Sequence, residues 1–147
     1  MVEVRGAPLQ LWERTARHLQ ELMREFSLLV IGVSAGGHAV PRRLLDLVSE
    51  LQLRFAGISE EPELARQTAM AAGRTTLDLT YRAPVEAAAA CSQLLELLDE
   101  ADIYCEQGKL MTLASTADQR AFRSWYLGEF IRQLQGEPPM PWPGPLD

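Results

Sequence analysis

The sequence predicts an all-α fold, a bundle of about five helices with one short extended segment (residues 75–83) and a proline-rich C-terminal tail. Three observations support this prediction. Apolar residues recur at steps of three and four over most of the chain, glycine or proline punctuates these stretches, and only one stretch alternates at a step of two. The 147 residues, 47% of them hydrophobic and 23% charged, are typical of one folded domain. We expect a helical domain at residues 1–136 and an extended tail at residues 137–147.

The first helix has the most regular pattern. Its apolar face alternates three-residue and four-residue steps at Leu9, Trp12, Ala16, Leu19, Met23, Phe26 and Val30. Pro8 suits the first turn, where a missing N–H leaves no hydrogen bond unmade. The pair Gly36 and Gly37 predicts the end of the helix.

Two shorter helices follow. The second begins at Pro41, ends before Gly57, and has one apolar face with a single polar exception, Gln52. The third begins near Ser59 with three glutamates in its first turn, where the helix dipole favours negative charge, and ends before Gly73. Because its apolar side chains are largely alanines, we expect it at the edge of the bundle.

Residues 76–82 alternate apolar and polar side chains, with Leu77, Leu79 and Tyr81 on the apolar side, which is typical of a strand. We find no obvious second strand in the sequence, and an isolated strand leaves its own backbone unpaired. We therefore expect an extended crossover that lies on the helices, or a strand that pairs with a second copy of the chain in a dimer.

The last two helices occupy most of the C-terminal half. One runs from Pro84 to about Gln107 and carries two adjacent apolar stripes, so we expect it at the centre of the bundle. The other follows Thr116, which has capping-box spacing to Gln119, and it ends at Gly136. The tail after it contains five prolines, a composition that predicts an extended conformation.

The charge of the chain excludes some classes of partner. With 20 acidic and 14 basic side chains the net charge is −6, and the arginines are scattered, so we expect neither a nucleic acid nor an anionic membrane as a partner. The longest apolar run, Ser27–Ala35, is shorter than the roughly 20 residues that span a bilayer. The N-terminus lacks a signal pattern, and we expect a cytoplasmic location. Cys91 and Cys105 fall about 20 Å apart on one predicted helix, so we expect two reduced thiols.

The segment Gly32–Gly37 reads G-x-S-x-G-G and resembles the serine loop of the chemotaxis-receptor methylesterases. A serine nucleophile needs a base and an orienting carboxylate. For Ser34 the histidines are His18, inside the first helix, and His38, four residues later, whereas that family takes its histidine from farther downstream. We therefore predict a glycine-rich connection between helices, no catalytic residues and a protein that is not an enzyme.

We also expect no metal site and no cofactor. Metal sites in helical bundles use Glu-x-x-His pairs on facing helices, and the chain has none. The possible ligands, which are His18, Glu21, Asp99, Asp102 and Glu106, are typical of a solvated acidic face. Asp102 interrupts an apolar stripe, and we expect it to be a buried acid bonded to an arginine.

The aromatic residues of the last helix and the tail are candidates for binding a protein partner. They are Trp125, Tyr126, Phe130 and Trp142. Pro138 and Pro141 form a P-x-x-P motif, which suits the aromatic groove of a partner. We prefer the alternative that the tail folds back onto its own domain with Trp142 as the anchor.

The order of segments resembles the helical C-terminal region of actinobacterial ATP-binding regulatory proteins. The segments that carry the resemblance are residues 19–33, 40–48, 77–84, 97–105, 110–114, 125–131 and 141–143. In those proteins this region follows a histidine-kinase-like ATPase domain of the anti-sigma-factor type, which would lie before Met1. The chain contains no asparagine to serve as the family's magnesium ligand, so nucleotide binding does not carry over. The resemblance implies an accessory signalling module.

Three functions remain open at this point. The leading hypothesis is a non-enzymatic regulatory domain of a bacterial signal-transduction protein, which binds a protein partner or forms a homodimer. The second is a sensor domain that binds a small molecule between its helices. The third is a serine hydrolase that uses Ser34.

Overall fold

The computed structural model describes residues 1–32, 39–55, 57–107 and 112–145. Within these ranges the chain forms two strands and five helices, in the order β1 (Val2–Pro8), α1 (Leu9–Gly32), α2 (Ala39–Arg54), α3 (Glu60–Ala71), β2 (Thr76–Tyr81), α4 (Ala87–Glu106) and α5 (Ala117–Leu134). The predicted helices are therefore confirmed as a mostly helical fold. The fold is not purely α, because β1 and β2 form a small sheet.

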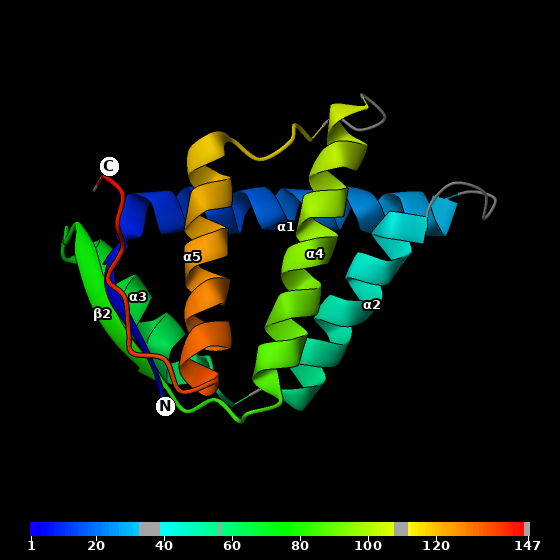
Figure 1. Cartoon of the computed structure of the whole chain (residues 1–147). Helices are drawn as coiled ribbons and strands as arrows, with labels where there is room; N and C mark the ends of the chain where they lie inside the picture. Colours follow the sequence, from blue (N-terminus) through cyan, green and yellow to red (C-terminus); the bar gives the residue numbers. More distant parts are fainter. Residues whose placement is uncertain (33–38, 56, 108–111, 146–147) are drawn as a thin grey trace.

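The long helix α1 crosses a layer formed by the other long helices (Figure 1). In this layer α4 packs against α5 on one side and against α2 on the other, and α1 contacts both α2 and α5. The sheet lies beside α5 at one end of the molecule, and α3 packs against β2 there. This arrangement places α4 between α2 and α5 (Figure 1).

The expectation that residues 76–82 lack a strand partner within the chain was wrong. β2 pairs antiparallel with β1, with Val4 opposite Leu79 and Ala7 opposite Leu77. A bulge falls between Val4 and Ala7 at Gly6, whose φ of 66° suits glycine, and the Gly6 N–H donates to Asp78 Oδ1 at 2.6 Å. The bulge breaks the alternation of β1 after two apolar residues, so the strand has no clear sequence pattern.

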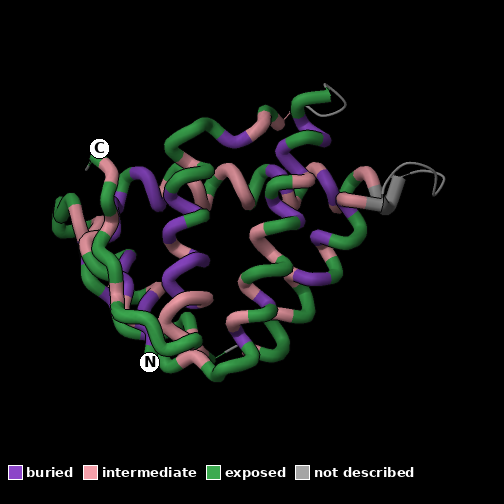
Figure 2. Tube along the Cα trace, viewed as in Figure 1, coloured by how far each residue is buried: buried purple, intermediate pink, exposed green. Residues whose placement is uncertain are grey.

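Two apolar clusters form the core. One lies between the sheet, the start of α1, and α5, and includes Val4, Trp12 and Phe130. The other lies between α1, α2 and α4, and includes Phe26 and Leu44. Figure 2 shows buried residues alternating with exposed ones along the helices, as expected for amphipathic helices.

The C-terminal tail lies against the sheet and α5. The backbone N–H of Trp142 donates to the Arg5 carbonyl at 3.1 Å. The ring N–H of Trp125 donates to the Met140 carbonyl at 2.9 Å. The Trp142 ring lies 5.4 Å from the Trp125 ring and 6.0 Å from that of Phe122, measured between centroids. The folded-back arrangement is therefore the one that the structure shows. The predicted capping box of Thr116 and Gln119 is present at the start of α5.

Candidate functional site

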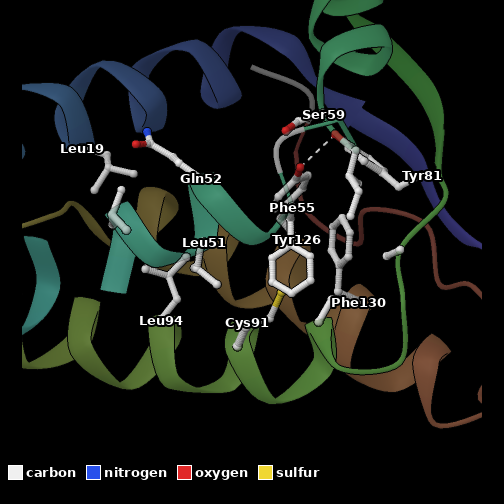
Figure 3. Close-up of a pocket in the computed structure, with 15 residues that line it drawn as sticks. Leu19, Leu51, Gln52, Phe55, Ser59, Tyr81, Cys91, Leu94, Tyr126 and Phe130 are labelled. Atoms are coloured by element: carbon white, nitrogen blue, oxygen red, sulfur yellow. Dashed lines mark hydrogen bonds between the residues drawn. The ribbon is translucent and has the colours of Figure 1, made fainter. Parts of the chain in front are cut away.

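A cavity of about 470 Å³ lies between α2, α4, α5 and the end of β2 (Figure 3). Its walls also include one residue of α1 and the connection between α2 and α3. The lining residues are Leu19, Val48, Leu51, Gln52, Phe55, Ile58, Ser59, Tyr81, Ala83, Ala87, Ala90, Cys91, Leu94, Tyr126 and Phe130. Cavities of this size, with mainly apolar walls and a few polar groups, are typical of small-molecule sites.

The cavity follows from small side chains on one half of α4. Ala87, Ala90 and Cys91 line it, and such side chains fill little of the 8–10 Å that separates packed helix axes. In the other half of α4, larger side chains such as Leu97 pack in one cluster with Leu44 of α2. The same pair of helices is therefore tightly packed at one end and leaves a cavity that is open to the surface at the other.

The walls of the cavity are uncharged. No Asp, Glu, Lys, Arg or His is among the lining residues in the part of the chain that the structure describes. The polar groups are the Gln52 amide, the Ser59 hydroxyl, the Cys91 thiol and the hydroxyls of Tyr81 and Tyr126. A charged ligand would lose its hydration here without meeting a counterion, so the chemistry favours a neutral molecule.

Two of the polar residues that line the cavity, Tyr81 and Tyr126, are hydrogen-bonded to each other. The Tyr126 hydroxyl donates to the Tyr81 hydroxyl oxygen at 2.8 Å, which leaves the Tyr81 proton for another acceptor (Figure 3). Burial raises the pKa of Tyr81 to about 12, although the hydrogen bond from Tyr126 opposes this shift. Burial, together with the neighbouring Tyr81, raises the pKa of Tyr126 as well. Both hydroxyls are therefore protonated at neutral pH.

The thiol of Cys91 is expected to react slowly with iodoacetamide. Burial raises its pKa to about 11, so at pH 8.5 the native thiol should react roughly 100-fold more slowly than an unhindered thiol whose pKa is about 8.5. The rate should rise tenfold per pH unit up to at least pH 10, as measured by mass spectrometry of the Cys91 peptide. The protein unfolded in urea is the control. A native rate that levels off near pH 9 would contradict the raised pKa.

A buried ion pair joins α4 to α5 at the other end of α5. Both carboxylate oxygens of Asp102 are bonded: one accepts from the Ser115 backbone N–H at 2.8 Å, the other from Arg123 Nη2 at 2.6 Å. Burial alone would raise the pKa of Asp102, but the hydrogen bonds from Ser115 and Arg123 and the charge of Arg123 lower it overall. The expectation that Asp102 is a buried acid bonded to an arginine is confirmed.

The four residues predicted to bind a partner lie in one aromatic cluster. Trp125 and Phe130 are buried, and Tyr126 and Trp142 are partly buried. Tyr126 and Phe130 line the cavity, whereas Trp125 and Trp142 contact each other under the tail. Their role in binding a protein stays a prediction.

Several lining residues were not singled out from the sequence as site residues. Gln52 gave the clearest signal, because it interrupts an otherwise apolar helix face. The alanines at the start of α4 gave a second signal, because they leave a central helix with small side chains. Ser59 and Cys91 gave none that separates them from an ordinary helix cap and a core thiol.

Two of the residues considered for a serine hydrolase site, Ser34 and His38, lie outside the described residues. His18 Nε2 lies 2.6 Å from the Leu113 carbonyl oxygen.

Among the described residues, no three His, Cys, Asp or Glu side chains are grouped in a way that could hold a metal ion. Within the same ranges, no helix combines the length and apolar character needed to cross a bilayer. Cys91 and Cys105 are both free.

Comparison with known proteins adds no family to this description. No protein-family model, no curated protein and no solved structure matches the chain.

Proposed function

We propose that this chain is a sensor domain that binds a small, neutral and mainly apolar molecule in the cavity between α2, α4 and α5. The observation that carries the proposal is the cavity itself, whose volume of about 470 Å³ falls in the range of small-molecule sites. Its uncharged walls support the choice of a neutral ligand. This is the second of the functions left open by the sequence.

The polar groups of the cavity restrict the ligand further. The Tyr81 hydroxyl retains a proton to donate, the Gln52 amide can both donate and accept, and Ser59 can do the same. A ligand with one or two uncharged oxygen or nitrogen atoms and a larger apolar body satisfies these groups. Among the described residues that line the cavity, none is a histidine or a carboxylate, the commonest general bases, which supports binding without chemistry.

Ligand binding gives a physical route to regulation. The cavity wall includes residues of α2, α4, α5 and β2, so a bound molecule contacts elements that are far apart in the sequence. Binding to the folded state stabilises the arrangement of these elements. We also propose the signalling role that the sequence resemblance implies. In that role, a protein partner would respond to the arrangement of helices that the ligand stabilises.

Substitution of Ala90 by phenylalanine is expected to block the cavity. The probe is N-phenyl-1-naphthylamine, which is neutral, apolar and fluorescent in a dry environment. Because the new ring occupies the space of the probe, its affinity should fall about tenfold or more, the equivalent of about 1.4 kcal/mol. Fluorescence titration measures the affinity.

Ala89→Phe is the matched control. Ala89 is the neighbouring residue on α4, but it is exposed, whereas Ala90 is buried at the cavity wall. Circular dichroism and cooperative thermal unfolding should show that both variants are folded. Equal probe affinity in the Ala90→Phe and Ala89→Phe proteins, or no binding by the unchanged protein, would overturn the proposal.

A further inference from the structure

The residues that hold the C-terminal tail form a site on β1 and α5. They are Arg5 of β1 and Phe122, Trp125 and Glu129 of α5, and we call them the tail site. The tail runs from the end of α5 along the side of β1 (Figure 1). Two elements that are far apart in the sequence therefore hold one extended segment.

The tail site binds the tail through the backbone of the tail. The Met140 N–H donates to the buried carboxylate of Glu129 at 3.2 Å, and the Met140 carbonyl accepts the ring N–H of Trp125. The backbone N–H of Trp142 donates to the Arg5 carbonyl. Because every peptide has a backbone, an extended segment of another protein can make the same bonds, provided that neither donor is a proline.

One side chain of the tail contacts the tail site closely. The Trp142 ring packs against the rings of Trp125 and Phe122. In contrast, Met140 is 52% exposed, and the prolines on either side of Trp142 are exposed as well. The tail site therefore selects an aromatic side chain at the position of Trp142 and tolerates variation at Met140.

The prolines of the tail match the positions of these bonds. They stand at positions 139, 141 and 143, so the residues between them, Met140 and Trp142, carry the N–H groups of this stretch. Both of these N–H groups are bonded to the tail site. Alternating prolines also hold a chain extended before it binds, which reduces the entropy lost on binding.

We propose that the tail site is a docking site for a partner peptide of the form Pro-X-Pro-Trp-Pro, and that the chain's own tail competes for it. The partner is an extended segment of another protein, with N–H groups at the X and Trp positions. The proposal does not rest on the function proposed for the cavity between α2, α4 and α5.

The tail site has polar groups that need a peptide. Without the tail, the ring N–H of Trp125 loses its acceptor and the Arg5 carbonyl loses its donor. The next outward-facing residue of β1, Glu3, is already paired, because its N–H and carbonyl are both bonded to the Gln133 amide at 2.8 Å. Docking at the outer edge of β1 is therefore confined to Arg5.

A peptide of residues 137–145, labelled with fluorescein, tests the proposal. In the unchanged protein it must compete with the tail, whose effective concentration is on the order of millimolar. Trp142→Ala weakens this competition and leaves the tail site itself unchanged. The peptide should therefore bind the Trp142→Ala protein saturably, and about tenfold or more tightly than it binds the unchanged protein. Fluorescence anisotropy measures the affinity.

Two altered peptides form a matched pair. Met140→Pro removes the N–H that Glu129 accepts, and the affinity for the Trp142→Ala protein should fall about tenfold, as expected for a hydrogen bond to a charged group. Met140→Ala keeps this N–H and removes a side chain that is half exposed, so the affinity should change by less than about threefold.

Four results would overturn the proposal. Three concern the peptide: equal affinity for the Met140→Pro and Met140→Ala peptides, equal affinity of the unchanged and Trp142→Ala proteins, and no binding to a Trp142→Ala protein that circular dichroism shows to be folded. The fourth is a dimer of the unchanged protein that Trp142→Ala converts to a monomer in light scattering, because the tail of a second copy would then be the occupant.

If the Trp142→Ala protein does not fold, the unchanged protein labelled with ¹⁵N decides the matter. Unlabelled peptide at about 10 mM should exceed the effective concentration of the tail and displace it. The ring N–H resonance of Trp142 should then move to its position in the free peptide, because the ring leaves those of Trp125 and Phe122. A resonance that stays in place would contradict a tail site open to other peptides.

Discussion

Replacement of Asp102 by alanine is expected to lower the free energy of unfolding by about 3 kcal/mol, because it leaves the buried Arg123 cation without its buried counterion. The change also removes the acceptor of the Ser115 N–H. We place the effect at the lower end of the range for broken buried pairs because Asp99 still contacts the same guanidinium nitrogen. Urea unfolding monitored by tryptophan fluorescence measures the effect.

Asp99→Ala is the matched control for this prediction. Asp99 and Asp102 both lie 2.6 Å from Arg123 Nη2, but the side chain of Asp99 is 64% exposed and that of Asp102 only 6%. Removing the exposed partner should lower the free energy of unfolding by less than about 1 kcal/mol. Equal free energies of unfolding for the two alanine variants would contradict the claim that burial of the Asp102 ion pair causes the larger loss of stability.

The same ion pair predicts a dependence of stability on pH. The pKa of Asp102 in the folded protein lies below its ordinary value of 3.8. The ionised carboxylate therefore contributes fully to the free energy of unfolding above its ordinary pKa. This contribution is lost as the pH falls through the lowered pKa of the folded protein. The unchanged protein should lose stability more steeply below pH 4 than an Asp102→Asn variant does.

The second large effect is expected for Phe26→Ala, which should lower the free energy of unfolding by about 3–5 kcal/mol. Phe26 is fully buried in α1, and its ring meets that of Tyr104 in α4 edge to face, with centroids 5.9 Å apart. The substitution leaves a cavity where α1 crosses α4. Guanidinium unfolding measures the change.

Leu28→Ala serves as the control for Phe26. It lies two residues away on the same helix, is 66% exposed, and should change the stability by less than about 0.5 kcal/mol. A loss below about 1 kcal/mol for Phe26→Ala would mean that α1 does not cross α4 as described.

The helices of this protein could be predicted because each one has an apolar face of its own. The regular steps along α1 and the capping box at Thr116 are local patterns, and the structure confirms both. Asp102 was predicted to be buried for a similar reason, since a single acid within an apolar stripe has to find a cation. The sequence patterns that predict these features each lie within a single helix.

The sheet and the cavity depend on contacts between distant segments. The partner residues of β1 lie 68 to 79 positions farther along the chain, as in Pro8 with Thr76 and Val2 with Tyr81, and the bulge at Gly6 hides the alternation of β1. The cavity arises where Ala87 and Ala90 leave space opposite α2 and the tyrosine pair, and a sequence does not show which small side chains will face each other. Among the described residues the Arg123 Nε–H has no acceptor, which likewise becomes apparent only when its neighbours are placed.

The most direct test of the proposed function is to locate a bound molecule by nuclear Overhauser effects from unlabelled N-phenyl-1-naphthylamine to methyl groups of the ¹³C-labelled protein. Effects should appear at the methyl groups of Ala90 and Leu51, which line the cavity, and not at Leu53, which lies on the same helix as Leu51 but is 84% exposed. Effects confined to Leu53 and other exposed leucines would show that the probe binds the surface, and would contradict a ligand site between the helices.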